Sequence, residues 1–171
     1  MADPLKFGIL TVSDRSARGE RPDLSGPALL GVLQAEGWEV VLYEIIPDDF
    51  ALIRSQLVFW TSKNAPDVIL TTGGTGFAPR DITPEATRAV VERLTPGLDE
   101  AMRAASLRVT PHAMLSRAVS GIRGQTLIVN LPGSPKGAVE NLRVILPVLR
   151  HAVLLMRGDQ AGEQGHLASQ P

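Results

Sequence analysis

The sequence contains no cysteine, and this absence excludes several classes of site at once. Disulfide bonds, zinc sites with thiolate ligands and cysteine nucleophiles are all ruled out. The three histidines, His112, His151 and His166, lie far apart, and no two of them have the spacing of metal ligands. We therefore expect all three to be structural or exposed to solvent.

The chain also lacks a long apolar run and a strong net charge. No run approaches the ~20 residues that a membrane-spanning helix needs, and residues 1–6 contain no apolar signal region. The formal net charge is −1, whereas a general binder of nucleic acid or membrane surfaces is normally basic. We expect a cytoplasmic protein that binds neither nucleic acid nor membranes.

The composition indicates a soluble globular protein. Its 171 residues are 44% hydrophobic and 20% charged, which does not suit a disordered chain. A chain of this length buries roughly 70% of its unfolded surface, which is enough for one core. We expect a single domain over residues 1–157. Residues 158–171 are expected to be a flexible tail, because they show no apolar periodicity.

Strand-like and helix-like stretches alternate along the chain. Strands are expected at residues 6–12, 38–46, 67–72, 118–122 and 126–129. Helices are expected at residues 25–36, 49–60, 85–94 and 98–107 and from residue 135 onward, where Pro147 would bend or divide the last one. The alternation predicts a three-layer α/β/α fold with a mostly parallel sheet. The closely spaced strands near residues 118–129 predict one antiparallel element.

The most informative stretch runs from Val68 to Glu85. An apolar strand ends in a loop containing Gly73, Gly74 and Gly76, and Thr83-Pro84-Glu85 then resembles a helix start with Thr83 as its N-cap. A strand, a glycine loop and a helix start can together bind an anion through backbone N–H groups. The alternative is a tight turn whose glycines serve only steric needs.

Two familiar phosphate-binding motifs do not match this loop. A Walker A motif requires Gly-Lys-Ser/Thr at its end, but here Gly76 is followed by Phe77 and Ala78. The glycine spacing also differs from that of the dinucleotide-binding fingerprint.

Polar or glycine-rich segments follow four of the predicted strands. In mostly parallel sheets, ligands bind at the edge where the carboxyl ends of the strands meet. We therefore expect a site built from Ser13-Asp14, Pro47-Asp48-Asp49, residues 71–81 and residues 132–136.

Asp48 and Asp81 are the candidate metal or acid–base carboxylates of this site. Together they could hold one Mg²⁺ against ATP phosphates. Alternatively, Asp48 or Asp49 caps the following helix, and Asp81 pairs with Arg80 on the surface. Lys136 is similarly open: it suits a helix start if an anion lies nearby, and it is otherwise a solvated lysine.

Several short motifs occur in order along nearly the whole chain. The most specific are Thr71-Thr-Gly-Gly-Thr-Gly76 and Arg80-Asp-Ile-Thr-Pro-Glu-Ala-Thr87, supported by Asn130-Leu-Pro-Gly-Ser-Pro-Lys136. The others are Val12–Arg15, Ser25–Pro27, Ile46–Asp48, Met102-Arg103 and Leu115–Arg117. In these motifs the sequence resembles the MogA/MoaB family of molybdenum-cofactor biosynthesis, and within it most closely the MogA-type molybdopterin adenylyltransferases.

This resemblance implies an enzyme that transfers AMP from ATP to the terminal phosphate of molybdopterin, releases pyrophosphate and requires Mg²⁺. It implies that Asp48 and Asp81 are the catalytic and metal-binding residues. It also implies a homotrimer, or in some members a hexamer, that passes its product to a molybdate-inserting partner enzyme. The expected substrate- and nucleotide-binding residues are Ser13, Asp14, Thr72, Gly73, Gly74, Thr75, Gly76, Arg80, Thr83, Pro84, Glu85, Pro132, Gly133, Ser134 and Lys136.

Two other functions remain open on the same resemblance. Related domains occur inside larger proteins, so the chain could be a non-catalytic molybdopterin carrier or scaffold. It could also be a MoaB-like member with weak or different activity. The presence of both Asp48 and Asp81 favours the enzyme, because a pure binder has less need of metal-binding carboxylates.

Overall fold

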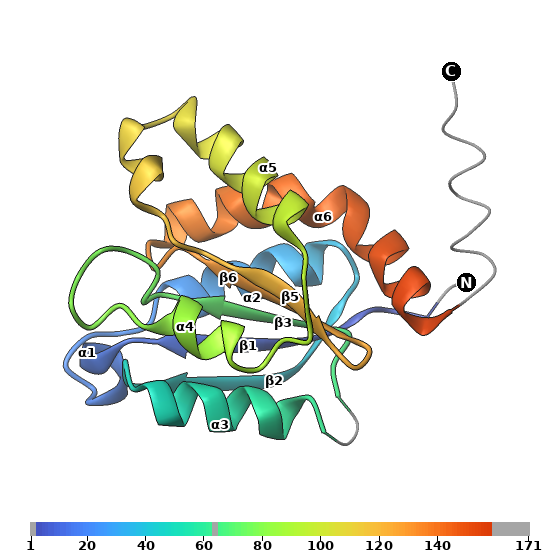
Figure 1. The fold of residues 1–171 in the computed structure, drawn as a ribbon, viewed down its shortest axis with the longest axis horizontal. Coiled ribbons are helices and arrows are strands. Elements are labelled where there is room, and N and C mark those ends of the chain that lie inside the picture. Colours follow the sequence, from blue (N-terminus) through green and yellow to red (C-terminus); the bar gives the residue numbers. More distant parts are fainter. Residues whose placement is uncertain (1–2, 63–64, 159–171) are drawn as a thin grey trace.

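A computed structural model describes residues 3–62 and 65–158 of the protein. In these residues, one six-stranded sheet lies between two layers of helices (Figure 1). The strand order is β2-β1-β3-β6-β5-β4. The strands are β1 (Lys6–Val12), β2 (Glu39–Ile46), β3 (Val68–Thr72), β4 (Arg93–Leu94), β5 (Ser120–Arg123) and β6 (Thr126–Leu131). Strands β2, β1, β3 and β6 run parallel, whereas β5 and β4 are antiparallel to their neighbours. The predicted α/β/α fold with one antiparallel element is thus confirmed.

Two sets of helices cover the two faces of this sheet. The helices are α1 (Asp14–Ala17), α2 (Ser25–Ala35), α3 (Phe50–Trp60), α4 (Thr83–Arg88), α5 (Pro96–Leu107) and α6 (Pro135–Arg157), with the 3₁₀ helix η1 (Pro111–Leu115). Helices α2, α5 and α6 pack on one face, and α3 and α4 pack on the other (Figure 1). The central strands β1, β3 and β6 are buried on both sides, and in β3 the neighbouring residues Ile69 and Leu70 enter opposite cores.

The segment after the glycine loop differs from the prediction. Helix α4 ends at Arg88 instead of continuing to Leu94, and Arg93–Leu94 forms the edge strand β4. After α4 the N–H groups of Val90 and Val91 both donate to the carbonyl of Thr87 (3.0 Å each) in a turn, and the N–H of Glu92 then donates to the carbonyl of Ile122 on β5 (2.8 Å). Pairing with β5 therefore outweighs local helix formation here.

Two predicted helix caps are also wrong. Ile82, not Thr83, holds the cap position of α4, because the Thr83 N–H donates to Gly74 O (3.1 Å) and brings Thr83 into the first turn. Ser25 does not cap α2; the carboxylate of Asp23 accepts the N–H groups of Ser25 and Gly26 instead (3.0 and 3.1 Å). A contact with the glycine loop thus moves Thr83 into the helix, and a nearby carboxylate takes the capping role expected of Ser25.

Three further predictions concern the loop after β1, the long helix α6 and the C-terminal tail. The predicted loop after β1 begins with the short helix α1, which Ser13 caps through the Ser16 N–H (3.2 Å). Helix α6 is not divided, since it continues through Pro147 with Ile145 and Leu149 buried on either side. The proposed tail lies outside the described residues except for Gly158, so it stays a prediction. In the described parts of the chain, no helix has the length and apolarity to cross a membrane.

Candidate functional site

A cavity of about 730 Å³ lies at the sheet edge where the carboxyl ends of β1, β2, β3 and β6 meet. All four segments that the sequence analysis placed there contribute to its walls. The predicted site residues that line it are Ser13, Asp14, Asp48, Thr72, Gly73, Gly74, Asp81, Gly133 and Ser134. Parallel strands have brought together side chains that lie up to about 120 residues apart in the sequence.

A second, smaller cavity of about 280 Å³ lies between α5, η1 and the start of α6. Four predicted site residues line it, namely Thr75, Gly76, Pro132 and Ser134. Its other walls combine apolar side chains such as Met102 and Leu115 with the polar Asp99 and Asn141. Ser134 lines both cavities, so the two are neighbours that share a wall.

The remaining predicted site residues line neither cavity. Thr83 and Pro84 are buried behind the glycine loop, and Glu85 forms an ion pair with Arg117. The Lys136 ammonium lies 3.8 Å from Glu140, and its side chain is 77% exposed. Arg80 also lines neither cavity, but it binds Asp14, which lines the larger one.

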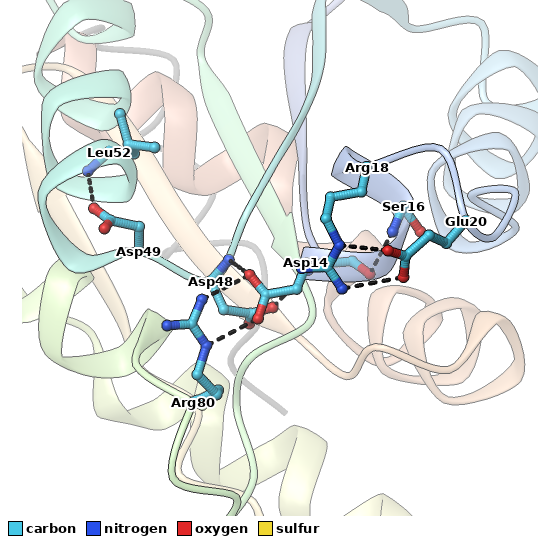
Figure 2. A network of polar contacts seen from close by, with 9 residues as sticks. Asp14, Ser16, Arg18, Glu20, Asp48, Asp49, Leu52 and Arg80 are labelled. Atoms are coloured by element: carbon cyan, nitrogen blue, oxygen red, sulfur yellow. Dashed lines mark hydrogen bonds and ion pairs between the residues drawn. The ribbon is translucent and has the colours of Figure 1, made fainter.

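Asp14, Asp48 and Arg80 form a polar network at the cavity (Figure 2). The Asp14 N–H donates to Asp48 Oδ2 (2.9 Å), and the Asp48 N–H donates to Asp14 Oδ1 (3.1 Å). Arg80 binds Asp14 with Nε (2.8 Å to Oδ2) and Nη2 (2.7 Å to Oδ1). Arg80 thus pairs with Asp14 and not with Asp81. Asp49 accepts the Leu52 N–H (2.9 Å) and caps α3, which leaves Asp48 facing the cavity.

The two joined carboxylates have opposite electrostatic environments. The bidentate hydrogen bonds from Arg80 hold the pKa of Asp14 below its usual value, despite partial burial. Burial raises the pKa of Asp48, and the negative charges of Asp14 and Asp81 raise it further. A half-buried carboxylate that resists ionisation in a cavity is a feature of functional sites.

This raised pKa predicts a stability effect for Asp48→Asn. A carboxyl whose folded pKa exceeds its unfolded pKa stabilises the fold when protonated, and this contribution is lost as pH rises through the folded pKa. We therefore expect Asp48→Asn, measured by urea unfolding without divalent cations, to be more stable than the parent protein at pH 7. The difference should shrink towards pH 4. Equal stabilities at both pH values would contradict the electrostatic account of this site.

The loop glycines leave room for both carboxylates. A Cβ atom at Gly74 would lie 3.0 Å from Asp48 Oδ1 and 2.3 Å from Thr83 Oγ1, and one at Gly76 would lie 2.8 Å from Asp81 Oδ2. Both carboxylates therefore lie directly against the loop backbone. The buried Thr83 hydroxyl behind the same loop has no hydrogen-bond partner among the described residues. The loop region thus has an unused polar group beside the candidate carboxylates.

The carboxylate oxygens of Asp48 and Asp81 are suitable ligands for a hard divalent cation. Carboxylate oxygens are the ligands that Mg²⁺ prefers, and it usually binds one or two of them and completes its shell with water and phosphate oxygens. The described residues contain no group of three or more acidic or histidine side chains arranged to hold a metal. Asp48 and Asp81 could therefore provide part of a magnesium site, but not a closed metal cage.

Comparison with known proteins places this arrangement in a family. The family model described as "Probable molybdopterin binding domain" matches residues 8–151. The chain belongs to this family. It is 41% identical to the molybdopterin adenylyltransferase of Helicobacter pylori strain J99 over 175 aligned positions, which cover 98% of this chain and 97% of that protein.

Two further proteins are similar to most of this chain. Gephyrin of Dictyostelium discoideum is 43% identical over 87% of this chain, but the match spans only 22% of gephyrin. The crystal structure of the molybdopterin biosynthesis enzyme MoaB from Thermus thermophilus superposes with a TM-score of 0.85. It is 54% identical, and the superposition covers 91% of this chain and 98% of that one.

Sequence reasoning missed several residues of this molybdopterin-binding domain. They are Thr11 near the end of β1 and Arg15, Arg21 and Asp23 between β1 and α2, all of which line the larger cavity. The pattern Asp-x-Ser-Gly was an available signal for Asp23, because an aspartate two residues before a helix start often accepts its first N–H groups. Arg15 stands in the matching segment Val12–Arg15 but was not named as a site residue, and Arg21 carried no such signal.

Asp23 is the centre of a second polar cluster in the domain. Its Oδ2 accepts hydrogen bonds from the hydroxyls of Thr11 (2.6 Å) and Tyr43. Burial opposes its ionisation, but these bonds and those from the Ser25 and Gly26 amides outweigh burial and lower its pKa. Asp23 thus links β1, β2 and α2 beside the cavity.

This cluster predicts an unusual tyrosine titration. Burial, and then the hydrogen bond to Asp23, raise the pKa of Tyr43 to about 12. Tyr43 is the single tyrosine of the chain, so phenolate absorbance reports on it alone. We expect little ionisation at pH 10.5 in the parent protein, whereas Asp23→Asn should shift the titration towards the ordinary value of about 10. Identical titrations in both proteins would contradict the contact.

Proposed function

We propose that this protein is a molybdopterin adenylyltransferase. It would transfer AMP from ATP to the terminal phosphate of molybdopterin and release pyrophosphate. Likeness to the Helicobacter pylori enzyme over 98% of the chain supports this activity. The observation that carries the proposal is the single cavity lined by Asp48, Asp81, the glycine loop and the N-terminal end of α6.

The reaction requires two anions to be held against each other. An oxygen of the molybdopterin phosphate attacks the α-phosphorus of ATP, and the bond from that phosphorus to the bridging oxygen of pyrophosphate breaks. Such transfer depends on positioning and charge neutralisation more than on covalent chemistry. Arg15 and Arg21 bring positive charge to the larger cavity, and the start of α6 adds the positive end of a helix dipole.

Asp48 and Asp81 would hold the required Mg²⁺. When bound, the cation neutralises phosphate charge and helps to align the reacting groups. In the protein itself, the Asp14 N–H fixes Asp48 Oδ2, and the Ala78 N–H fixes Asp81 Oδ2 (3.0 Å). These bonds hold both carboxylates in place before substrate arrives.

The smaller cavity is the proposed place for the pterin ring. A flat bicyclic ring suits a pocket with Met102 and Leu115 on its walls, and Asp99 and Asn141 offer polar partners to the ring edge. Because Ser134 lines both cavities, a pterin bound here would extend its phosphate into the larger one. The smaller cavity would thus bind the pterin, and the larger cavity would bind the nucleotide.

The assembly and setting of the enzyme belong to the same proposal. We infer a cytoplasmic homotrimer, with a hexamer as the alternative, that passes its product to a molybdate-inserting partner enzyme. Exposed apolar side chains between α5 and η1 and within η1, among them Val109 (61%) and Met114 (65%), would be covered in such an assembly. Sedimentation equilibrium tests the number of copies directly.

A direct assay tests the activity. The protein is incubated with freshly prepared molybdopterin, ATP and Mg²⁺, and adenylylated pterin and pyrophosphate are both measured. Equal formation of the two products is the expected result. Binding of molybdopterin without product would favour the second candidate, a non-catalytic carrier or scaffold module. That candidate is supported by gephyrin, of which a related segment forms only a part.

A further inference from the structure

We propose that Arg117 is the positioning residue for Asp81, a role that rests on the proposed function of that carboxylate. Arg117 lies between η1 and β5 and is itself far from both ends of the glycine loop in sequence. Its guanidinium donates from Nε to Gly76 O (2.7 Å) and from Nη2 to Asp81 O (2.6 Å). Its third nitrogen, Nη1, is paired with the carboxylate of Glu85 in α4.

These contacts hold the second part of the loop, residues 76–81, at both of its ends. Gly76 and Asp81 bracket the segment that carries Phe77 and Arg80, both exposed to solvent. Within the segment, the Asp81 N–H donates to Ala78 O (2.9 Å) and the Ala78 N–H donates to Asp81 Oδ2. Those two bonds shape a local turn but do not attach it to the rest of the protein. The ion pair of Arg80 with Asp14 attaches the middle of the segment, and Arg117 attaches its two ends, Gly76 and Asp81, through their carbonyls.

The attachment bears directly on the carboxylate of Asp81. A Cβ atom at Gly76 would lie 2.8 Å from Asp81 Oδ2, so the Gly76 peptide packs against this oxygen. By fixing the carbonyls of Gly76 and Asp81, one guanidinium sets the position of the carboxylate relative to Asp48. A lysine cannot do this, because its single ammonium is a point donor and cannot span three separated acceptors.

The same segment also connects the two cavities. The N–H of Arg117 donates to Thr75 O (2.9 Å), and its neighbours Leu115, Ser116 and Ala118 line the smaller cavity. The side chain of Arg117 is only 34% exposed, so it is enclosed between the wall of one cavity and the loop of the other. Arg117 therefore fixes the position of Asp81 relative to the proposed pterin pocket.

The test compares Arg117→Lys with Arg123→Lys. Arg123 is a matched control, since it is also half-buried and donates to a backbone carbonyl, Val90 O (3.1 Å), but lines neither cavity. A misplacement of about 1 Å can cost about 100-fold in turnover. We expect Arg117→Lys to lower kcat by about that factor and to require more Mg²⁺, while Arg123→Lys retains parental kcat and Mg²⁺ dependence.

Amide hydrogen exchange provides a readout that does not depend on activity. Loss of the charged hydrogen bonds should speed exchange at Ala78 and Asp81 by about tenfold or more, with core amides of β3 unchanged. Parental exchange at these two amides, or parental kcat in Arg117→Lys, would overturn the proposal. If the parent protein forms no product, the adenylyltransferase function is wrong, and the exchange data still decide whether Arg117 holds the loop.

Discussion

Asp81→Asn is expected to lower the rate of AMP transfer by about three orders of magnitude while molybdopterin affinity changes by less than about threefold. Removing one group that stabilises developing charge costs about 10²–10³ in kcat, and a metal ligand acts on the same charge. The amide keeps the shape of the side chain and can still accept the Ala78 N–H. The loss of turnover would therefore result from the lost charge and the weaker metal binding. Steady-state kinetics would measure the turnover, and calorimetry with Mn²⁺ would measure the metal binding.

Asp49→Asn is the matched control for that substitution. Asp49 neighbours the candidate carboxylate Asp48 but lies outside the cavity walls and caps α3 through the Leu52 N–H. Asparagine is about as good an N-cap as aspartate, so both stability and turnover should be retained. Full turnover in Asp81→Asn would show that this carboxylate does not hold a required cation, and the proposed mechanism would have to be abandoned.

Gly73→Ala is expected to destabilise the fold by about 3 kcal/mol or more, because two penalties add. Gly73 has φ +104°, a conformation that side chains rarely adopt. A Cβ atom there would lie 2.2 Å from the carbonyl oxygen of Val12, at the end of β1. A backbone atom cannot rotate away, so β1 and the loop would have to separate. Urea unfolding gives the free energy, and ATP binding should weaken with it.

Gly31→Ala tests the same chemical change without either penalty. Gly31 lies within α2, and a Cβ atom there meets no atom within 4 Å. Alanine is preferred to glycine in helices by about 1 kcal/mol, so this variant should be slightly more stable than the parent protein. If Gly73→Ala instead unfolded within about 1 kcal/mol of the parent protein, the loop would be more adaptable than its packing indicates.

The sequence predicted most of the architecture because its signals there are local. Alternating apolar runs and turns indicated the parallel strands, and the short connection at residues 123–125 indicated the antiparallel pair. The last helix was correctly expected from residue 135 onward, and Ser134 caps it by accepting the Gly137 N–H (3.2 Å). The failures involve competition with distant groups. Thr83 enters α4 because its N–H meets Gly74 O, and β4 forms because β5 offers an edge to pair with.

Predictions about the site likewise succeeded for short motifs and failed for contacts between residues that are far apart in the sequence. The glycine loop and the strand-end aspartates could be found because short motifs placed them at one sheet edge. The pairing of Arg80 with Asp14 could not be found, because residues 66 positions apart meet only when β1 and β3 lie side by side. Arg117 was part of a recognised motif, but its role required knowing that its guanidinium reaches both ends of the loop.

Periodicity and motifs of adjacent residues were enough to predict the fold class, the family and the edge of the sheet at which the polar segments gather. The folded structure was needed to show that, of two carboxylates lining the same cavity, one is paired with an arginine and the other has a raised pKa. Charge and burial act through space, between residues that no local pattern connects. Asp14 and Asp48 are alike as residues, and their different chemistry comes from Arg80 on one side and from burial on the other.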